Sequence, residues 1–345
     1  MNKLTKVGLS ALCGSLASIS AANAGEMTVT GGVDMSWMSY SGDTTGNPIG
    51  IGSNLTFKGS GELDNGWSFD YTVAMLNQDA YSTSAVSLTM GGLGTLNINQ
   101  GDSGNGIDAF DDVMPTAWEE PWGAGLGTGV ALVSGVGPQS NIQYKSPTFA
   151  GTTITLATAP DMGAAKTNDK GNSVGGGTSG AGYDATIKIN PSLGTEILSG
   201  LNLYIGGHMQ EHYVDGTPGN DRYEAVGAVT FDIGPISLGY ATSGIDTGKN
   251  TTVTDVAWYK NHFYGIAFNI NDDLSISYGN HTSQQGHVND GVKSSEDVEI
   301  DAYQIAYTMG GASIRLAELE VDNAAYQEAD AYDKEARVIS VSLAF

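Results

Sequence analysis

Carboxylates are concentrated in one segment of the sequence that contains no basic residue. Neither Lys, Arg nor His occurs from residue 59 to residue 144, and the acidic residues gather within residues 101–129. Clustered carboxylates raise the local cation concentration and offer the oxygen ligands that hard divalent cations prefer. Their spacing does not match a calcium-hand loop, so the segment predicts no dedicated metal site and offers at most adventitious binding of divalent cations. The candidate residues are Asp108, Asp111, Asp112, Glu119 and Glu120.

Three short motifs resemble catalytic or phosphate-binding sites, but their contexts argue against that chemistry. Residues 208–212 spell H-x-x-E-H, a zinc-peptidase pattern that needs a helix to bring both histidines to one metal. Here the motif continues an alternating, strand-like pattern, and on a strand the two histidines would lie about 13 Å apart. Residues 171–175 match G-x-S-x-G without a following helix, and residues 244–249 are one residue short of a phosphate loop. We therefore predict that the protein is not an enzyme and has no cofactor.

The N-terminus has the features of a secretory signal peptide. Lys3 and Lys6 precede a short apolar run, and residues 22–24 form an A-x-A cleavage site. Cleavage after residue 24 would remove Cys13, the only cysteine of the chain. The whole chain carries a formal charge of −24, and loss of the two lysines makes the mature protein still more negative. So acidic a protein is not expected to bind nucleic acid through its phosphates.

Apolar and polar residues alternate through almost all of the remaining sequence, for example over residues 67–75 and 337–345. Alternation over such lengths predicts strands with one apolar and one polar face. No segment has the roughly 20 consecutive apolar residues of a membrane helix. We count sixteen strands, one of them over roughly residues 251–270, joined by connections that are alternately short and long.

This alternation of short turns and long loops is typical of a transmembrane β-barrel. In lipid every backbone polar group must be satisfied within the protein, so the sheet has to close. The apolar face then contacts lipid and the polar face lines water, because sixteen strands enclose a bore too wide for side chains to fill. Aromatic residues near predicted strand ends, such as Tyr278 and Tyr303, predict girdles at the membrane interface. We predict an all-β, 16-stranded antiparallel transmembrane β-barrel over residues 25–345.

Three stretches carry a family resemblance. Residues 94–98 spell Gly-Thr-Leu-Asn-Ile, residues 141–151 begin Asn-Ile-Gln-Tyr-Lys-Ser-Pro, and the chain ends on Phe345. With these features the whole mature chain resembles the general (trimeric) porins of Gram-negative outer membranes, of the proteobacterial type. The resemblance implies that residues 101–129 are the third loop, folded into the barrel as a constriction, and we expect its aromatic residues Phe110 and Trp122 to pack on the wall.

The resemblance also implies a function and partners. It implies a homotrimer in the outer membrane, surrounded by lipid, that lets small hydrophilic solutes and ions diffuse passively through a water-filled channel. Phe345 would be the signal for the barrel-assembly machinery. Two alternatives remain at this point. One is a substrate-specific channel of the same fold, and the other is a secreted non-channel β-protein such as an adhesin-like sandwich, which needs neither the terminal Phe nor two lengths of connection.

Porins of this type carry basic wall side chains opposite the acidic loop. By strand parity Asp34 and Asp70 point into the bore, and four basic residues do so as well. Where the family often has Arg at the end of the fifth strand, this chain has Asn99 and Gln100. We therefore expect a cation-preferring pore. The four basic wall residues are Lys58, Lys145, Lys188 and Arg315.

Overall fold

The structure is a computed structural model that describes residues 25–41, 46–77, 79–101, 104–163, 179–191, 198–214, 217–250, 252–289 and 295–345. The expected signal peptide (residues 1–24) and the G-x-S-x-G motif (residues 171–175) lie outside these ranges. Among the described residues, no helix has the length and apolar character needed to cross a membrane.

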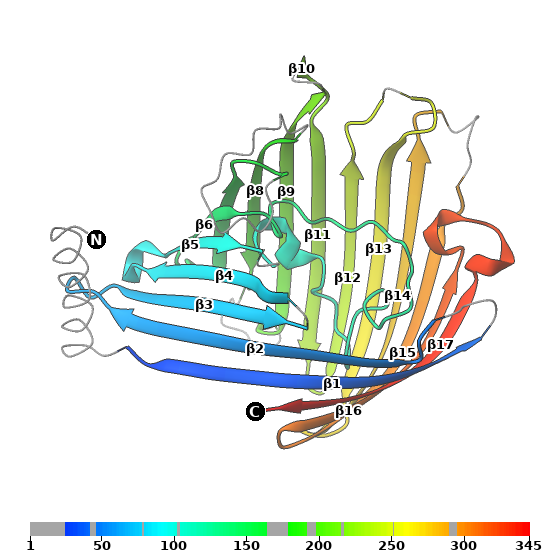
Figure 1. The fold of residues 1–345 in the computed structure, drawn as a ribbon, viewed down its shortest axis with the longest axis horizontal. Helices are drawn as coiled ribbons and strands as arrows, with labels where there is room; N and C mark the ends of the chain where they lie inside the picture. The colour runs from blue at the N-terminus through cyan, green and yellow to red at the C-terminus, as the bar shows by residue number, and fades with distance from the viewer. Residues whose placement is uncertain are drawn as a thin grey trace, which may run out of the picture.

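Sixteen strands of five or more residues, which we call the long strands, and one two-residue strand make up the sheet in the described part of the chain (Figure 1). The two-residue strand, β10 (Thr217–Pro218), lies in the connection between β9 and β11 and pairs with the end of β9. The long strands are β1 (Met27–Ser41), β2 (Ile49–Glu62), β3 (Ser68–Leu76), β4 (Asp79–Thr89), β5 (Thr95–Gln100), β6 (Asn141–Lys145), β7 (Thr152–Ala159), β8 (Ser179–Ile189), β9 (Leu201–Val214), β11 (Arg222–Ile233), β12 (Ile236–Asp246), β13 (Val256–Asn269), β14 (Leu274–His287), β15 (Val298–Met309), β16 (Ala312–Asp322) and β17 (Lys334–Ala344).

The sheet closes because its first and last strands pair. β1 and β17 are antiparallel, from Gly32 opposite Ala344 to Ser41 opposite Glu335. Phe345 exchanges two backbone hydrogen bonds with Gly31, with N···O distances of 2.8 and 2.9 Å. Every other long strand is antiparallel to its neighbours along the chain, with β9 and β11 paired directly. The predicted closed, 16-stranded antiparallel barrel is confirmed, and a two-sheet sandwich is excluded.

Most short turns lie at one end of the barrel and most long loops at the other, as the spacing of the strands predicted. The exceptions are the short connection of residues 77–78 between β3 and β4 at the loop end and the longer one of residues 190–200 between β8 and β9 at the turn end. Residues 64–66 form one of the short turns, closed by a hydrogen bond from the Leu63 N–H to the Trp67 carbonyl at 2.7 Å. Gly66 has φ of 80°, a left-handed conformation that glycine adopts without a steric penalty. The longest connection, residues 101–140, joins β5 to β6 at the other end. In outer-membrane barrels the short turns face the periplasm and the long loops face outward.

One strand begins later than predicted. We expected a strand over roughly residues 251–270, but β13 begins at Val256. The N–H of Thr252 donates to the Asp255 carboxylate at 3.0 Å, and the N–H of Asp255 donates to the Thr252 carbonyl at 3.1 Å. These local bonds form a turn, because a side-chain acceptor competes with the ladder for the backbone donors.

The outward face of the barrel is apolar across its central band. Leu238 and Ile276, on β12 and β14, remain 41% and 38% exposed because nothing in the chain covers them. Tyr264, Tyr278 and Tyr303 form a row on three adjacent strands, with ring centroids 6.1 and 4.9 Å apart. Rows of this kind mark the level of the membrane interface.

The alternation reverses on β15, β16 and β17 near their loop ends. Here the inward residues Ile300, Leu319 and Val338 are apolar and at most 2% exposed. Polar side chains therefore do not line the whole bore as expected, because this inward face packs against the loop between β5 and β6. The outward residues at the same level are acidic and exposed, and they include Glu299, Glu318, Glu320, Asp322 and Glu335.

Candidate pore constriction

The third loop extends further than the predicted residues 101–129 and covers residues 101–140. It leaves the wall after β5, crosses the inside of the barrel and rejoins the wall at β6 (Figure 1). Its short 3-10 helix η2 (Gly106–Phe110) lies against β8, β9 and β11. Further on, the Ala117 N–H donates to Ser277 Oγ on β14 at 2.8 Å. The Trp118 N–H and the next N–H donate to Gln304 Oε1 on β15, each at 3.0 Å. The predicted inward fold of this loop is therefore confirmed.

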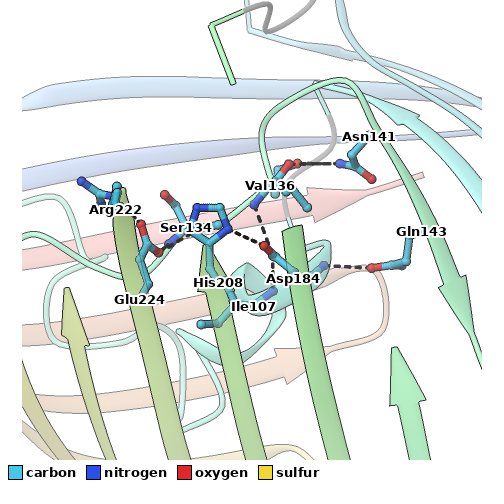
Figure 2. Close-up of polar contacts among 12 residues, drawn as sticks. Ile107, Ser134, Val136, Asn141, Gln143, Asp184, His208, Arg222 and Glu224 are labelled. Carbon is cyan, nitrogen blue, oxygen red and sulfur yellow. Dashed lines mark hydrogen bonds and ion pairs between the residues drawn. The ribbon is translucent and has the colours of Figure 1, made fainter. Parts of the chain in front are cut away.

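Two buried carboxylates on the wall hold both ends of the loop (Figure 2). Asp184 Oδ2 on β8 accepts hydrogen bonds from the N–H groups of Ile107 at 2.8 Å and Val136 at 3.2 Å. Glu224 Oε2 on β11 accepts from the Ser134 N–H at 2.8 Å and from the following N–H at 3.0 Å. Asp184 thus joins the outgoing and returning segments of the loop to one point of the wall, and Glu224 fixes the returning segment beside it.

Each of these anchor carboxylates has a basic partner. His208 Nδ1 on β9 lies 2.6 Å from Asp184 Oδ1, and both side chains are fully buried. Arg222 Nε lies 2.7 Å from Glu224 Oε1 on the same strand. The first histidine of the H-x-x-E-H motif is therefore a partner of a loop anchor on strand β9. Within the described ranges, no group of His, Cys, Asp and Glu is arranged to hold a metal ion.

Sequence reasoning missed these anchors. Strand parity places Asp184, His208 and Glu224 on the inward face, and it would have identified them as polar residues of the bore. Nothing in the pattern of residues indicates that the loop passes over them, because the contacts join positions up to 90 residues apart. The signal available was the presence of charged or ionisable residues on the inward face of these strands, Lys188 and Arg222 among them.

A network of side-chain amides holds the base of the loop. Asn99 Nδ2 donates to Asn105 Oδ1 at 3.0 Å and to Asn141 Oδ1 at 2.9 Å. Gln143 Oε1 accepts from the Gly106 N–H at 2.8 Å. Asn99 entered our sequence argument only as a missing positive charge. The structure shows that its amide NH2 group donates to both β6 and the loop, so it connects β5 to both without adding a charge.

Aromatic residues of the loop pack against the wall as predicted. The Phe110 and Tyr204 rings meet edge to face, with centroids 5.2 Å apart. Trp122 lies 5.1 Å from both Phe263 and His281, measured between ring centroids. Aromatic pairs of this kind contribute about 0.5–1.5 kcal/mol each beyond their burial. Packing and hydrogen bonding together make the loop a fixed part of the barrel interior.

The last loop before β17 covers the returning part of the third loop. Thr128 O accepts a hydrogen bond from the Ala325 N–H at 2.8 Å. Tyr326 OH accepts from the Ala131 N–H at 3.2 Å and bonds Ser283 Oγ at 2.8 Å. The constriction is thus supported from β8 and β11 at one end and from residues 323–333 at the other.

The candidate acidic residues lie on the part of the loop between these supports. Burial raises the pKa of Asp108 to about 6, of Asp111 to about 8 and of Glu120 to about 9. Burial also raises the pKa of Asp112, with a further contribution from the charge of Glu119. In the described part of the chain, none of these carboxylates forms a salt bridge with Lys or Arg. The charge of the loop therefore changes across the neutral pH range.

Two of the candidate wall cations are paired with the candidate wall carboxylates. Arg315 Nη1 on β16 lies 3.3 Å from Asp34 Oδ2 on β1. The Arg315 guanidinium also lies over the Trp118 ring of the loop, 5.8 Å from its centroid. Lys58 Nζ lies 3.3 Å from Asp70 Oδ1 on the neighbouring strand. Each pair leaves no net charge on its part of the wall.

The other two candidate wall cations lie on the same face as the loop anchors. Lys188 Nζ is 5.1 Å from the centroid of the Tyr204 ring, which itself contacts the loop. Lys145 shares its strand and its parity with Gln143, whose side chain bonds the loop. The inward placement of the wall residues follows their predicted parity, whereas their effect on ion selectivity stays a prediction.

Comparisons with known proteins agree with this architecture. The family model of Gram-negative porins matches residues 8–341. A solved anion-selective porin from Comamonas acidovorans has 14% identity and a TM-score of 0.61, over 93% of this chain and 100% of that chain. Salmonella typhi OmpF in complex with daunomycin has 10% identity and a TM-score of 0.66, over 93% of this chain and 98% of that chain.

A third similar structure is outer-membrane-expressed OmpT of Vibrio cholerae, with 11% identity and a TM-score of 0.63, over 94% of this chain and 99% of that chain. A search of curated proteins by sequence found no match. At these sequence identities the similarity to solved structures shows only that the fold is shared. The assignment to a family rests on the match to the family model. Because that match extends over nearly the whole chain, the protein belongs to the Gram-negative porin family and lies in the bacterial outer membrane.

Proposed function

We propose that the protein forms a water-filled channel through which small hydrophilic solutes and ions diffuse passively, with a preference for cations. The observation that carries the cation preference is the distribution of ion pairs. Among the described residues, two of the four inward wall cations, Lys58 and Arg315, are paired with carboxylates and the other two, Lys145 and Lys188, are not. All five candidate loop carboxylates lack a Lys or Arg partner in the same part of the chain, so the loop acids outnumber the unpaired wall cations. The fixed charge beside the narrowest part of the bore is then dominated by the loop.

Unpaired carboxylates at a constriction favour cations for a simple electrostatic reason. A ring or patch of charged side chains of one sign, next to low-dielectric walls, concentrates ions of opposite charge and repels ions of like charge. The Comamonas porin has a similar barrel and is described as anion-selective, so the fold does not decide the sign of selectivity. In this chain the sign would follow from the third loop.

The pore itself is tested by reconstituting the purified protein. Stepwise conductance in planar bilayers, together with swelling of liposomes in small sugars, is expected from an open channel. Absence of both would contradict the proposal. Flux that saturates with the concentration of one solute would instead identify a substrate-specific channel of the same fold.

Cation preference is expected to increase with pH between about 5 and 9. A carboxyl group is neutral below its pKa, and burial raises the pKa of Asp108, Asp111 and Glu120 to about 6, 8 and 9. Raising the pH therefore adds negative charge to the loop in steps over this range. The measurement is the reversal potential under a fixed KCl gradient at several pH values, and a flat profile would show that these groups do not control selectivity.

Substitution of Arg315→Gln is expected to strengthen the cation preference. The change removes a positive charge that lies 3.3 Å from Asp34 and leaves that carboxylate unpaired in the bore. We expect the cation-to-anion permeability ratio to rise by about two- to fivefold, since one charge at close range in water contributes up to about 1 kcal/mol. Arg337→Gln is the matched control, because Arg337 is exposed and paired with Glu318 on the outside of the barrel. A shift toward anions in Arg315→Gln, or an equal shift in the control, would contradict the assignment.

Further parts of the proposal concern assembly and chemistry. We propose a homotrimer, no catalysed reaction and no cofactor, with Phe345 serving the barrel-assembly machinery. A trimer form is described for OmpT of Vibrio cholerae, whose fold is similar. Phe345 is 79% exposed while its backbone is bonded to Gly31, so its side chain is open to a partner. The mass of the detergent-solubilised protein before and after heating would test the trimer.

A further inference from the structure

Three glycines form a row on the inward face of β12, β13 and β14. Gly239 pairs directly with Gly265, and Gly265 pairs directly with Gly279. Ala302 on β15 continues the row of small residues, because it is the partner of Gly279. A glycine in the interior of a strand often marks a place where another backbone approaches closely. We call Gly239, Gly265 and Gly279 the glycine row.

The third loop crosses the inside of these strands (Figure 1), and its residues 115–121, which we call the seated segment, lie on all three glycines. A Cβ added at Gly239 would collide with the ring of the first residue of this segment, and a Cβ at Gly265 would lie 2.8 Å from the carbonyl oxygen of the same residue. A Cβ at Gly279 would lie 3.0 Å from Cγ of Pro121. Carbon atoms in contact are about 3.5–4.0 Å apart, so even the methyl group of Ala has no room unless the segment moves.

Contacts on both sides of the glycine row hold the seated segment in place along the strands. Toward the turn end, Ser277 Oγ and Gln304 Oε1 accept hydrogen bonds from its backbone N–H groups at 2.8 to 3.0 Å. Toward the loop end, Trp122 packs on Phe263 and His281, with 5.1 Å between the ring centroids of each pair. The direction that these contacts leave open to the segment is away from the wall, into the bore.

The distance from the seated segment to the opposite wall is the width of the bore at this level. Along the closed ring of long strands, β3 lies eight strands from β12 and therefore faces it across the barrel. Thr72 on β3 has the inward parity of Asp70. Because glycine has no side chain, the loop backbone lies close against the backbone of β12–β14, and the gap toward β3 is correspondingly wide.

We propose that the glycine row sets the width of the constriction, and with it the size of the largest solute that passes. The inference rests on the proposed channel function and assigns its size limit to three residues of the wall. A side chain at any of these positions would push the seated segment into the bore by about 1–3 Å, depending on its size, to restore normal contact distances. Pore diameter is one of the properties by which channels select what they pass.

The test uses the full-length protein and a graded series at one position of the row. Gly265→Ala, Gly265→Val and Gly265→Leu place side chains of increasing size beneath the seated segment. Gly227→Val is the matched control, because Gly227 on the neighbouring β11 pairs with the outward, exposed Ile205 and a Cβ there meets nothing within 4 Å. The rescue pair is Gly279→Ala with and without Pro121→Ala, because the two atoms nearest to the added Cβ both belong to the Pro121 ring.

Two properties are measured for each variant whose far-UV circular dichroism shows a folded barrel. The first is the distance between spin labels at Thr116→Cys in the seated segment and Thr72→Cys on β3, in a Cys13→Ser background. The second is single-channel conductance, together with the swelling of liposomes in sugars of increasing size. The distance measurement needs no channel activity, so it tests the glycine row independently of the proposed function.

We expect the distance between the labels to shorten by about 1–3 Å as the side chain at residue 265 becomes larger. Conductance should fall in the same order, by about twofold in Gly265→Leu, and the largest sugar that enters should become smaller. Gly227→Val should match the unmodified protein, and Pro121→Ala should restore the conductance lost in Gly279→Ala.

An unchanged distance in a folded Gly265→Leu variant would overturn the proposal. A longer distance with larger conductance would also overturn it, because the row would then serve only to retain the loop. If the distance shortens in a protein that conducts no ions even without substitution, the glycine row positions the loop and the proposed channel function is contradicted instead.

Discussion

Replacing Asp111, Asp112, Glu119 and Glu120 by their amides is expected to remove most of the cation preference of the pore. These are four of the five candidate loop carboxylates, which have no Lys or Arg partner among the described residues, whereas the wall charges of Lys58 and Arg315 are already paired. Asp108 stays in place, and because burial raises its pKa only to about 6 it still carries charge at neutral pH. The reversal potential under a KCl gradient should then fall well below that of the unmodified protein.

The pH dependence of this quadruple variant makes the test sharper. Burial raises the pKa of Asp111 to about 8 and of Glu120 to about 9, so the difference between variant and unmodified protein should be larger at pH 9 than at pH 5. Glu318→Gln/Glu320→Gln is the control, because these carboxylates are exposed on the outer side of β16. A variant that keeps the full cation preference would place the selective charge elsewhere in the channel.

Removing both anchor carboxylates, Asp184→Ala/Glu224→Ala, is expected to release the third loop from the wall. The change deletes the acceptors of four backbone N–H groups and leaves the buried His208 and the Arg222 guanidinium without their partners. Breaking one buried ion pair by removing one partner costs about 3–5 kcal/mol. We expect a lower free energy of unfolding in urea, with larger and noisier single-channel conductance because the loop no longer holds one position.

Two further variants separate the loop from the barrel as a whole. Asp184→Asn keeps one carbonyl oxygen to accept hydrogen bonds from the Ile107 and Val136 N–H groups, so its conductance should remain steady. Asp232→Ala removes an exposed carboxylate at the turn end of β11 that bonds only Ser237 in the described contacts, so it should change neither property. Steady conductance of normal size in the double Ala variant would show that packing of Phe110 and Trp122 alone holds the loop.

The barrel could be predicted from the sequence because lipid imposes a strong and repetitive requirement. Each strand must alternate and the sheet must close, so the same signal recurs along the chain and errors at single strands, such as the late start of β13 at Val256, do not change the result. The inward position of Lys58 and Arg315 followed from the same alternation. Their pairing with Asp70 and Asp34 did not, because it depends on which strands become neighbours and in which register.

The support of the constriction could not be predicted, because it depends on the path of a segment without periodicity. Asp184 and Glu224 are polar residues on an inward face whether or not a loop lies over them. The apolar inward residues Ile300 and Leu319 could not be predicted for the same reason. Their side chains are buried because the returning segment of the third loop packs over them. The local sequence pattern predicts the strands of the barrel wall. The position of the third loop inside the barrel depends on contacts between residues far apart in the sequence.

The reversal potential of the unmodified protein in a planar bilayer at neutral pH tests the proposed selective role of the third loop most directly. With a concentrated KCl solution on one side and a dilute one on the other, an excess flow of K⁺ down its gradient makes the dilute side positive. We predict a positive dilute side whose potential grows as the pH is raised toward 9. A negative dilute side, which signals preferred passage of chloride, would contradict the assignment of the acidic third loop as the selective element.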